Sequence, residues 1–118
     1  MQGTVYKLEE IVWMDPAQSA GLHHIFLDIV DQHGKRLVGE RARVSWTGGE
    51  AIVPIEEKAG EPWAGNLPMF AVLGTYAVQV VAAAGASDAV AGLGMGTPQE
   101  PKVKHHTSFG LRFRKLIT

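Results

Sequence analysis

The residues best suited to metal chemistry are the histidines, four of which form two adjacent pairs, His23–His24 and His105–His106. A zinc or copper site needs three or four converging ligands. Adjacent residues on a strand point to opposite faces, so each pair can offer one ligand to a given site. If the two strands are neighbours, one histidine of each pair meets the other, with Asp28 or Asp88 completing the site. The same spacing fits histidines that flank strands and face water, and we therefore predict no bound metal and no other cofactor.

Hydrolytic chemistry has no convincing set of residues in this sequence. Two carboxylates at a controlled separation are needed for glycoside hydrolysis, but nothing ties any two of the acidic residues across a cleft. Ser108, His106 and Asp88 supply the types of a Ser-His-Asp triad without the strand–turn–helix context of a nucleophile elbow. The segment Gly92–Gly96 lacks the lysine and the following helix of a phosphate loop, and its glycines favour a close-packed chain crossing. We predict a protein that is not an enzyme.

Aromatic side chains are the strongest functional candidates. Trp63 lies between Pro62 and Gly65 in a polar segment that we interpret as a loop. An exposed loop tryptophan can stack on a sugar ring or anchor a protein contact, with Tyr6 as a second stacking surface. The alternative is that the Trp63 ring folds back as a lid over the end of the domain. Trp13 and Trp46 lie in predicted strands and are expected in the core.

Basic side chains provide a second candidate contact surface. Arg112 and Arg114 alternate with apolar residues near the end of the chain. With Lys115, and with Arg41 and Arg43 if the strands are neighbours, they would form a basic stripe that contacts a partner. The alternative is a solvated face, whose charges also discourage unwanted strand addition.

Composition excludes several classes of protein. The chain has 118 residues, is 46% hydrophobic and carries a formal net charge of −1, which suits one folded domain over residues 1–118 and argues against general nucleic-acid binding. Cysteine is absent, so neither disulfides nor thiolate metal sites are available. No apolar run approaches the about 18 residues of a membrane helix. No signal peptide is visible.

Period-two alternation predicts the elements that position these side chains. The organising stretch runs from His24 to Trp46, where two amphipathic segments flank a turn that contains Asp31 and Gly34. We interpret it as a hairpin whose apolar face needs a second sheet. Further strands are expected over 5–13, with a bulge near Glu9 and Glu10 on an edge strand, and over 51–55, 69–73, 74–80, 107–114 and, as a short extended segment, 89–93. The predicted core contains Ile25, Leu27, Val44, Tyr76, Val78, Phe109 and Leu111.

Two segments resemble immunoglobulin-like and prealbumin-like β-sandwich modules of bacterial and phage surface proteins. The first is the pattern Leu27-Asp-Ile-Val-Asp31, Gly34-Lys-Arg-Leu37, Gly39 and Val44, and the second is Gly74-Thr-Tyr-Ala-Val-Gln-Val80. The tail from Ser87 to Phe109 is similar to accessory domains of cell-wall and polysaccharide proteins. The resemblance implies a single immunoglobulin-like antiparallel β-sandwich of about seven strands, with a tyrosine that forms a corner hydrogen bond.

These observations favour a structural or decorating subunit over a catalyst. We expect the chain to contact other protein subunits in an oligomeric surface assembly, with a phage capsid or tail favoured over a cell surface. The alternative is a carbohydrate-binding accessory module of a cell-wall or polysaccharide hydrolase. We expect no nucleic-acid partner and no membrane insertion. A small histidine metalloenzyme is the remote third possibility.

Overall fold

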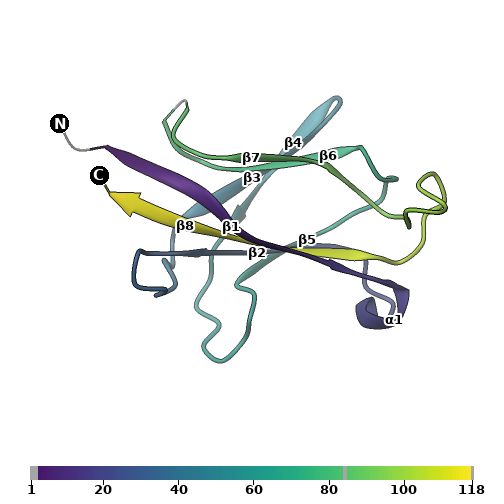
Figure 1. The fold of residues 1–118 in the computed structure, drawn as a ribbon, viewed down its shortest axis with the longest axis horizontal. Coiled ribbons are helices and arrows are strands. Elements are labelled where there is room, and N and C mark those ends of the chain that lie inside the picture. The colour runs from purple at the N-terminus through teal and green to yellow at the C-terminus, as the bar shows by residue number, and fades with distance from the viewer. Residues whose placement is uncertain (1–2, 84, 118) are drawn as a thin grey trace.

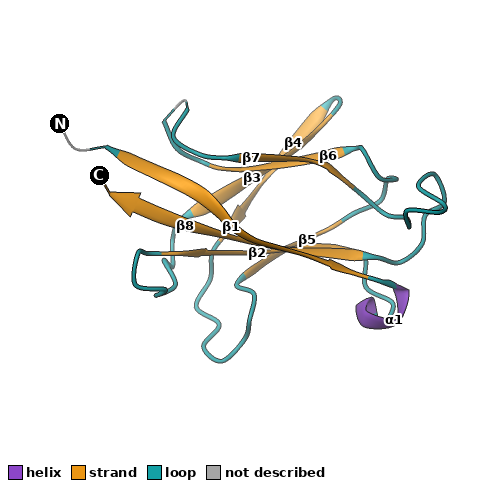
Figure 2. Cartoon of the chain, viewed as in Figure 1, coloured by secondary structure: helices purple, strands orange, loops and turns teal. Residues whose placement is uncertain are grey.

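Two four-stranded β-sheets pack face to face in the computed structural model, which describes residues 3–83 and 85–117 (Figures 1 and 2). Sheet A has the order β1-β8-β2-β5 and forms the lower layer in Figure 1, and sheet B has the order β4-β3-β6-β7 and forms the upper layer. This confirms the all-β sandwich, with eight strands in the described residues where about seven were expected. The elements are β1 (Thr4–Met14), α1 (Pro16–Ser19), β2 (His24–Val30), β3 (Arg41–Trp46), β4 (Gly49–Pro54), β5 (Gly65–Pro68), β6 (Tyr76–Val80), β7 (Ala89–Leu93) and β8 (Ser108–Ile117).

The core lies between the sheets and is made by alternate residues of the inner strands. Side chains of a strand point to opposite faces in turn, so every second residue of β2, β3, β6 and β8 faces the opposite sheet. All seven residues predicted for the core are buried, which confirms that set: Ile25, Leu27, Val44, Tyr76, Val78, Phe109 and Leu111.

The predicted hairpin between His24 and Trp46 is wrong, because β2 and β3 belong to different sheets. β2 pairs with β5 and β8, and β3 pairs with β4 and β6. A hairpin would place the two apolar faces side by side, whereas crossing to the other sheet lets the faces cover each other. The turn itself is as expected: the carboxylate of Asp31 accepts hydrogen bonds from the amides of His33 and Lys35, and Gly34 has a φ of 85°. The Lys35 amide is the main cause that lowers the pKa of Asp31.

Sheet A is mixed, which differs from the expected antiparallel arrangement. β8 lies between β1 and β2, antiparallel to the first and parallel to the second, with Leu111 beside Leu27. β1 is an edge strand, and its register with β8 shifts between Leu8 and Glu10. That shift confirms the predicted bulge.

Three further expectations differ from the structure. Residues 69–73 form no strand, and the short β5 instead lies within the predicted loop. Trp13 and Trp46 were expected in the core but are 37% and 36% exposed. Trp13 pairs with Phe109 near the end of edge strand β1, and Trp46 is the last residue of β3. Both stand at sheet ends, where the opposite layer does not cover them fully.

Candidate functional site

Tyr6 is a buried side chain of the core rather than an exposed stacking surface. It is 5% exposed, and its hydroxyl donates a hydrogen bond to Oε1 of Glu40, 3.0 Å away. Nζ of Lys115 lies 3.0 Å from the other carboxylate oxygen and 5.6 Å from the centroid of the Tyr6 ring. Burial, with the Glu40 hydrogen bond second, raises the pKa of Tyr6, and the Glu40 and Tyr6 hydrogen bonds raise the pKa of Lys115. The three groups therefore form a structural link between β1, β8 and the start of β3.

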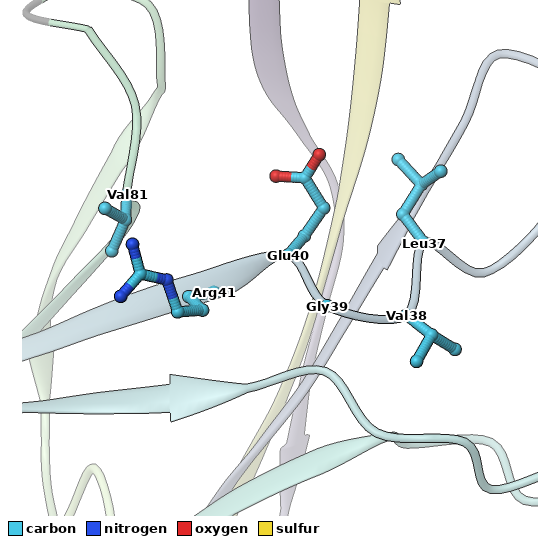
Figure 3. Close-up of a pocket in the computed structure, with 6 residues that line it drawn as sticks. All are labelled: Leu37, Val38, Gly39, Glu40, Arg41 and Val81. Atoms are coloured by element: carbon cyan, nitrogen blue, oxygen red, sulfur yellow. The ribbon is translucent and has the colours of Figure 1, made fainter.

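Glu40 also borders a hollow of about 470 Å³ (Figure 3). Its carboxylate points toward β1 and β8, while Val38 points away from it and Arg41 lies on the side of Val81. Because Tyr6 and Lys115 already occupy both carboxylate oxygens, we do not place the functional site in this hollow.

Trp63 lies across the outer face of sheet A, not over the end of the sandwich. Its half-buried ring rests on β8 against Gly110, where an added Cβ would overlap the ring atoms. The guanidinium carbon of Arg112 is 5.0 Å from the ring centroid, within the range of a cation–π contact. Glycine at position 110 is therefore what lets the ring approach the strand.

Arg112 and Arg114 take part in ion pairs that hold this face together. Arg112 pairs with Glu10, and its Nε is 3.7 Å from Oδ2 of Asp28. Arg114 donates from Nε to Glu9 across 2.6 Å. The predicted basic stripe with Arg41 and Arg43 does not form, because β3 and β8 lie in different sheets. The charges of these two arginines are largely balanced within sheet A.

A second hollow of about 230 Å³ borders Trp63 on the outer face of sheet A. Its lining combines two aromatic rings with an amide, a carboxylate and an amine: Phe26, Lys58, Glu61, Pro62, Trp63 and Asn66. Rings that stack and polar groups that accept or donate hydrogen bonds are what recognition of a sugar requires.

Three of the four paired histidines gather at one end of sheet A. The ring of His23 lies 5.7 Å from that of His24 and 5.0 Å from that of His106, whereas His105 contacts Glu100. Nδ1 of His23 donates to the carbonyl of Met69, and the His24 ring stacks on Phe26. Within residues 3–83 and 85–117, no group of three or more histidine or carboxylate side chains is arranged to hold a metal ion.

The residues of the candidate triad have separate structural roles. Oγ of Ser108 donates to the carbonyl of Leu22 and accepts from the amide of His24. Asp88 instead accepts from the amide of Leu8 and lies 3.8 Å from Nζ of Lys7. The glycine segment 92–96 forms the expected close crossing, since an added Cβ on Gly94 would overlap the main chain at Val72.

An apolar cleft at the end of the sandwich is the feature that the sequence did not predict. It is about 340 Å³ in volume and is lined by Trp46, Leu67, Pro68, Phe70 and Tyr76. The Phe70 side chain is 66% exposed, the highest value among the exposed large hydrophobic residues. The hydroxyl of Tyr76 accepts a hydrogen bond of 2.9 Å from the Phe70 amide, which confirms the predicted corner bond and fixes the chain at the cleft. The apolar run 69–73 was the available signal, but a short apolar run of this kind predicts a strand.

Comparison of the chain with protein-family models, with curated proteins and with solved structures finds no match.

In the part of the chain that the structure describes, no helix has the length and apolar character needed to cross a membrane.

Proposed function

We propose that this chain is a non-catalytic β-sandwich subunit that works through contacts with other protein subunits in a larger surface assembly. The observation that carries the proposal is the apolar cleft at the end of the sandwich, where the Phe70 ring projects beside Trp46. Aromatic side chains that are partly exposed around a concave apolar surface are typical anchors of protein interfaces.

The state of the charged residues supports binding over chemistry. Arg112, Arg114 and Glu40 all have ion-pair partners within the chain. Groups engaged in this way stabilise the sheets and are poorly placed to exchange protons with a substrate. Of the possible assemblies, the resemblance to phage and bacterial surface modules favours a virion capsid or tail.

A substitution at Phe70 tests the proposal. Phe70→Ser is compared with Ile52→Ser, a matched control on β4 that is also exposed but does not line the cleft. Tagged full-length chains are produced in the source organism, particles and envelope complexes are isolated, and the chain is quantified by mass spectrometry. We expect the unmodified chain and the control to copurify at a fixed ratio, and Phe70→Ser to be reduced at least about tenfold. Absence of the unmodified chain from every particle and complex would refute the proposal.

A carbohydrate-binding module is the second candidate function, and the hollow beside Trp63 favours it. Two aromatic rings and the Asn66 amide face the same space on sheet A, which is where a pyranose could stack and form hydrogen bonds. Cosedimentation with insoluble peptidoglycan, chitin and cellulose tests this function. Trp63→Ala and Asn66→Ala should each lower the bound fraction, while Phe70→Ser should not. No binding of the unmodified chain to any of these polymers would count against it.

A further inference from the structure

One edge of sheet A is closed along only part of its length. At the start of β1, the segment 86–88 covers the free edge: the Tyr6 amide donates to the Ala86 carbonyl, and the Asp88 amide donates to the Tyr6 carbonyl. Among the described residues, no strand pairs with this side of β1 beyond Leu8. Residues 9–14 therefore present an open strand edge.

The register shows which main-chain groups point outward along this edge. In an antiparallel pair, residues that bond to the partner strand alternate with residues whose amide and carbonyl point away. The amide and carbonyl of Tyr6 point away from β8. Lys115, which lies opposite Tyr6 on β8, therefore forms no main-chain hydrogen bonds with β1. Bonded and unbonded positions alternate along β8, so Leu111 and Phe109 also form no main-chain hydrogen bonds with β1. These two residues lie opposite Ile11 and Trp13. The outward main-chain groups of the open segment are therefore those of Ile11 and Trp13.

The side chains at these two positions are apolar and partly exposed. Ile11 is 49% exposed, and both it and Trp13 lie on the same face of the sheet as their buried cross-strand neighbours. The opposite layer does not fully cover this end of β1. A strand added at the edge would therefore gain both hydrogen bonds and apolar contact.

Other sheet edges have features that oppose strand addition. β4 ends in Pro54, β5 has four residues and ends in Pro68, and β7 contains Gly92 with a φ of 83°. Proline, short length and irregular backbone are usual ways of protecting an edge. β1 has 11 residues and no proline.

The charges on β1 do not protect its open part effectively. Glu9 and Glu10 would oppose a second identical edge by repulsion, but Glu9 is paired with Arg114 and Glu10 with Arg112 of β8. The formal net charge of the whole chain is −1, so long-range repulsion between copies is also weak.

We propose that β1 pairs with β1 of a second copy of this chain, antiparallel and about a two-fold axis at Val12. This inference rests on the proposed function and specifies one of its protein contacts. With the axis at Val12, Ile11 of each copy lies opposite Trp13 of the other. Both residues point their main-chain groups outward, so the register forms four hydrogen bonds and two cross-strand pairs of an aromatic with a β-branched side chain.

The two ends of the open segment fit this register. Leu8 of one copy would lie opposite Pro16 of the other, where β1 has ended and α1 begins. The β1 strand of the second copy would therefore end just where the segment 86–88 begins to cover the edge of the first copy. Axes at Ile11 or Trp13 would pair an outward residue with the bulge at Glu9 or with Asp15 beyond the strand, and form fewer bonds.

A single cysteine tests the register, because the chain has no cysteine of its own. At the axis, Val12 would face itself in a non-hydrogen-bonded pair, where Cα atoms are about 4.5 Å apart and a disulfide can form. Under mild oxidation at micromolar concentration, we expect Val12→Cys to give a covalent dimer. The matched control Ile52→Cys, exposed on β4 and away from the proposed contact, should form little covalent dimer. Equal crosslinking of the two variants would overturn the proposed register.

Sedimentation equilibrium of the unmodified full chain tests the pairing itself. We expect twice the mass of the 12.7 kDa chain at high concentration, and Trp13→Ser should raise the dissociation constant at least about tenfold. Ile52→Ser should leave it unchanged, and circular dichroism verifies that each variant is folded. A chain that is monomeric at several hundred micromolar would overturn the pairing. Because this measurement uses the purified chain alone, its failure is distinct from absence of the chain from a surface assembly.

Discussion

The carboxylate of Asp28 accepts a hydrogen bond of 3.0 Å from Nε of Arg36, and this pair attaches a long loop to sheet A. Arg36 also donates to the carbonyls of Lys58 and Glu61, which lie in the loop that contains Trp63. Asp28 is 4% exposed, and Arg112 lies on its other side. The loop is thus held to the outer face by a buried charge and two main-chain contacts.

Removing that buried charge should be strongly destabilising. We expect Asp28→Ala to lower the free energy of unfolding by about 3–5 kcal/mol, because two guanidinium groups would lose their buried partner. Denaturation in urea measures the change. Glu57→Ala, an exposed carboxylate in the same loop, is the control and should change stability by less than about 0.5 kcal/mol. Equal effects of the two substitutions would show that the ion pair does not hold the loop.

The contact between Trp63 and Gly110 predicts a non-additive pair of substitutions. Gly110→Ala should cost about 1–3 kcal/mol, because the new methyl group displaces the ring. When Trp63→Ala removes the ring first, the same substitution has room and should cost less. A double-mutant cycle measured by chemical denaturation gives the coupling between the two positions. Additive effects would mean that Trp63 does not rest on β8.

His24 should make the protein sensitive to mild acid. Burial, with the neighbouring His23 second, lowers the pKa of His24, and its Nδ1 has no hydrogen-bond partner among the described residues. The folded state therefore disfavours the protonated ring. Its contribution to stability is complete above the unfolded pKa of about 6.5 and is lost as the pH falls toward the lowered folded value. Melting temperatures from pH 8 to pH 5 should fall less in His24→Gln than in the unmodified chain, whereas His33→Gln, in an exposed turn, should follow the unmodified chain.

Tyr6 should act in the opposite pH range. Its raised pKa means that the folded state retains the phenolic proton, so this contribution is present below about pH 10 and is lost as the pH rises further. Tyr6→Phe should cost about 1.5–3 kcal/mol at neutral pH through the lost hydrogen bond to the charged Glu40 carboxylate. Unfolding free energies at pH 7 and pH 10.5 should differ less in Tyr6→Phe than in the unmodified chain. An unchanged alkaline dependence would remove Tyr6 as its source.

Period-two patterns predicted which side chains are buried, but not which sheet each strand joins. Alternation alone predicts that the side chains of Ile25 and Val44 face the core. Whether their strands lie side by side or face each other depends on pairing with β8, more than 60 residues after β3. Likewise, Gly65–Pro68 has the composition of a turn and becomes a strand because β2 offers it an edge.

Local patterns also indicated only part of the candidate site, because the rest depends on contacts between distant segments. Trp63 stood out because its side chain is large and its neighbours are loop-forming, but its resting place depends on Gly110, which no local pattern connects to it. The cleft at Phe70 is formed by the ends of several segments, and alternation carries no information about where a sheet stops covering its neighbour. Trp46 faces the predicted direction, but it is partly exposed because the opposite sheet does not extend fully over it.

The parallel pairing of β2 with β8 constrains how the protein is made on the ribosome. About 80 further residues must be translated after β2 before β8, its parallel neighbour, emerges. At ordinary rates of translation this takes on the order of ten seconds. During that interval one edge of β2 lacks its native partner strand, and sheet A lacks the strand that joins β1 to β2. Nascent chains stalled before Ser108 should accordingly engage chaperones and remain sensitive to proteases, and protection should arise in one step once β8 has cleared the exit tunnel.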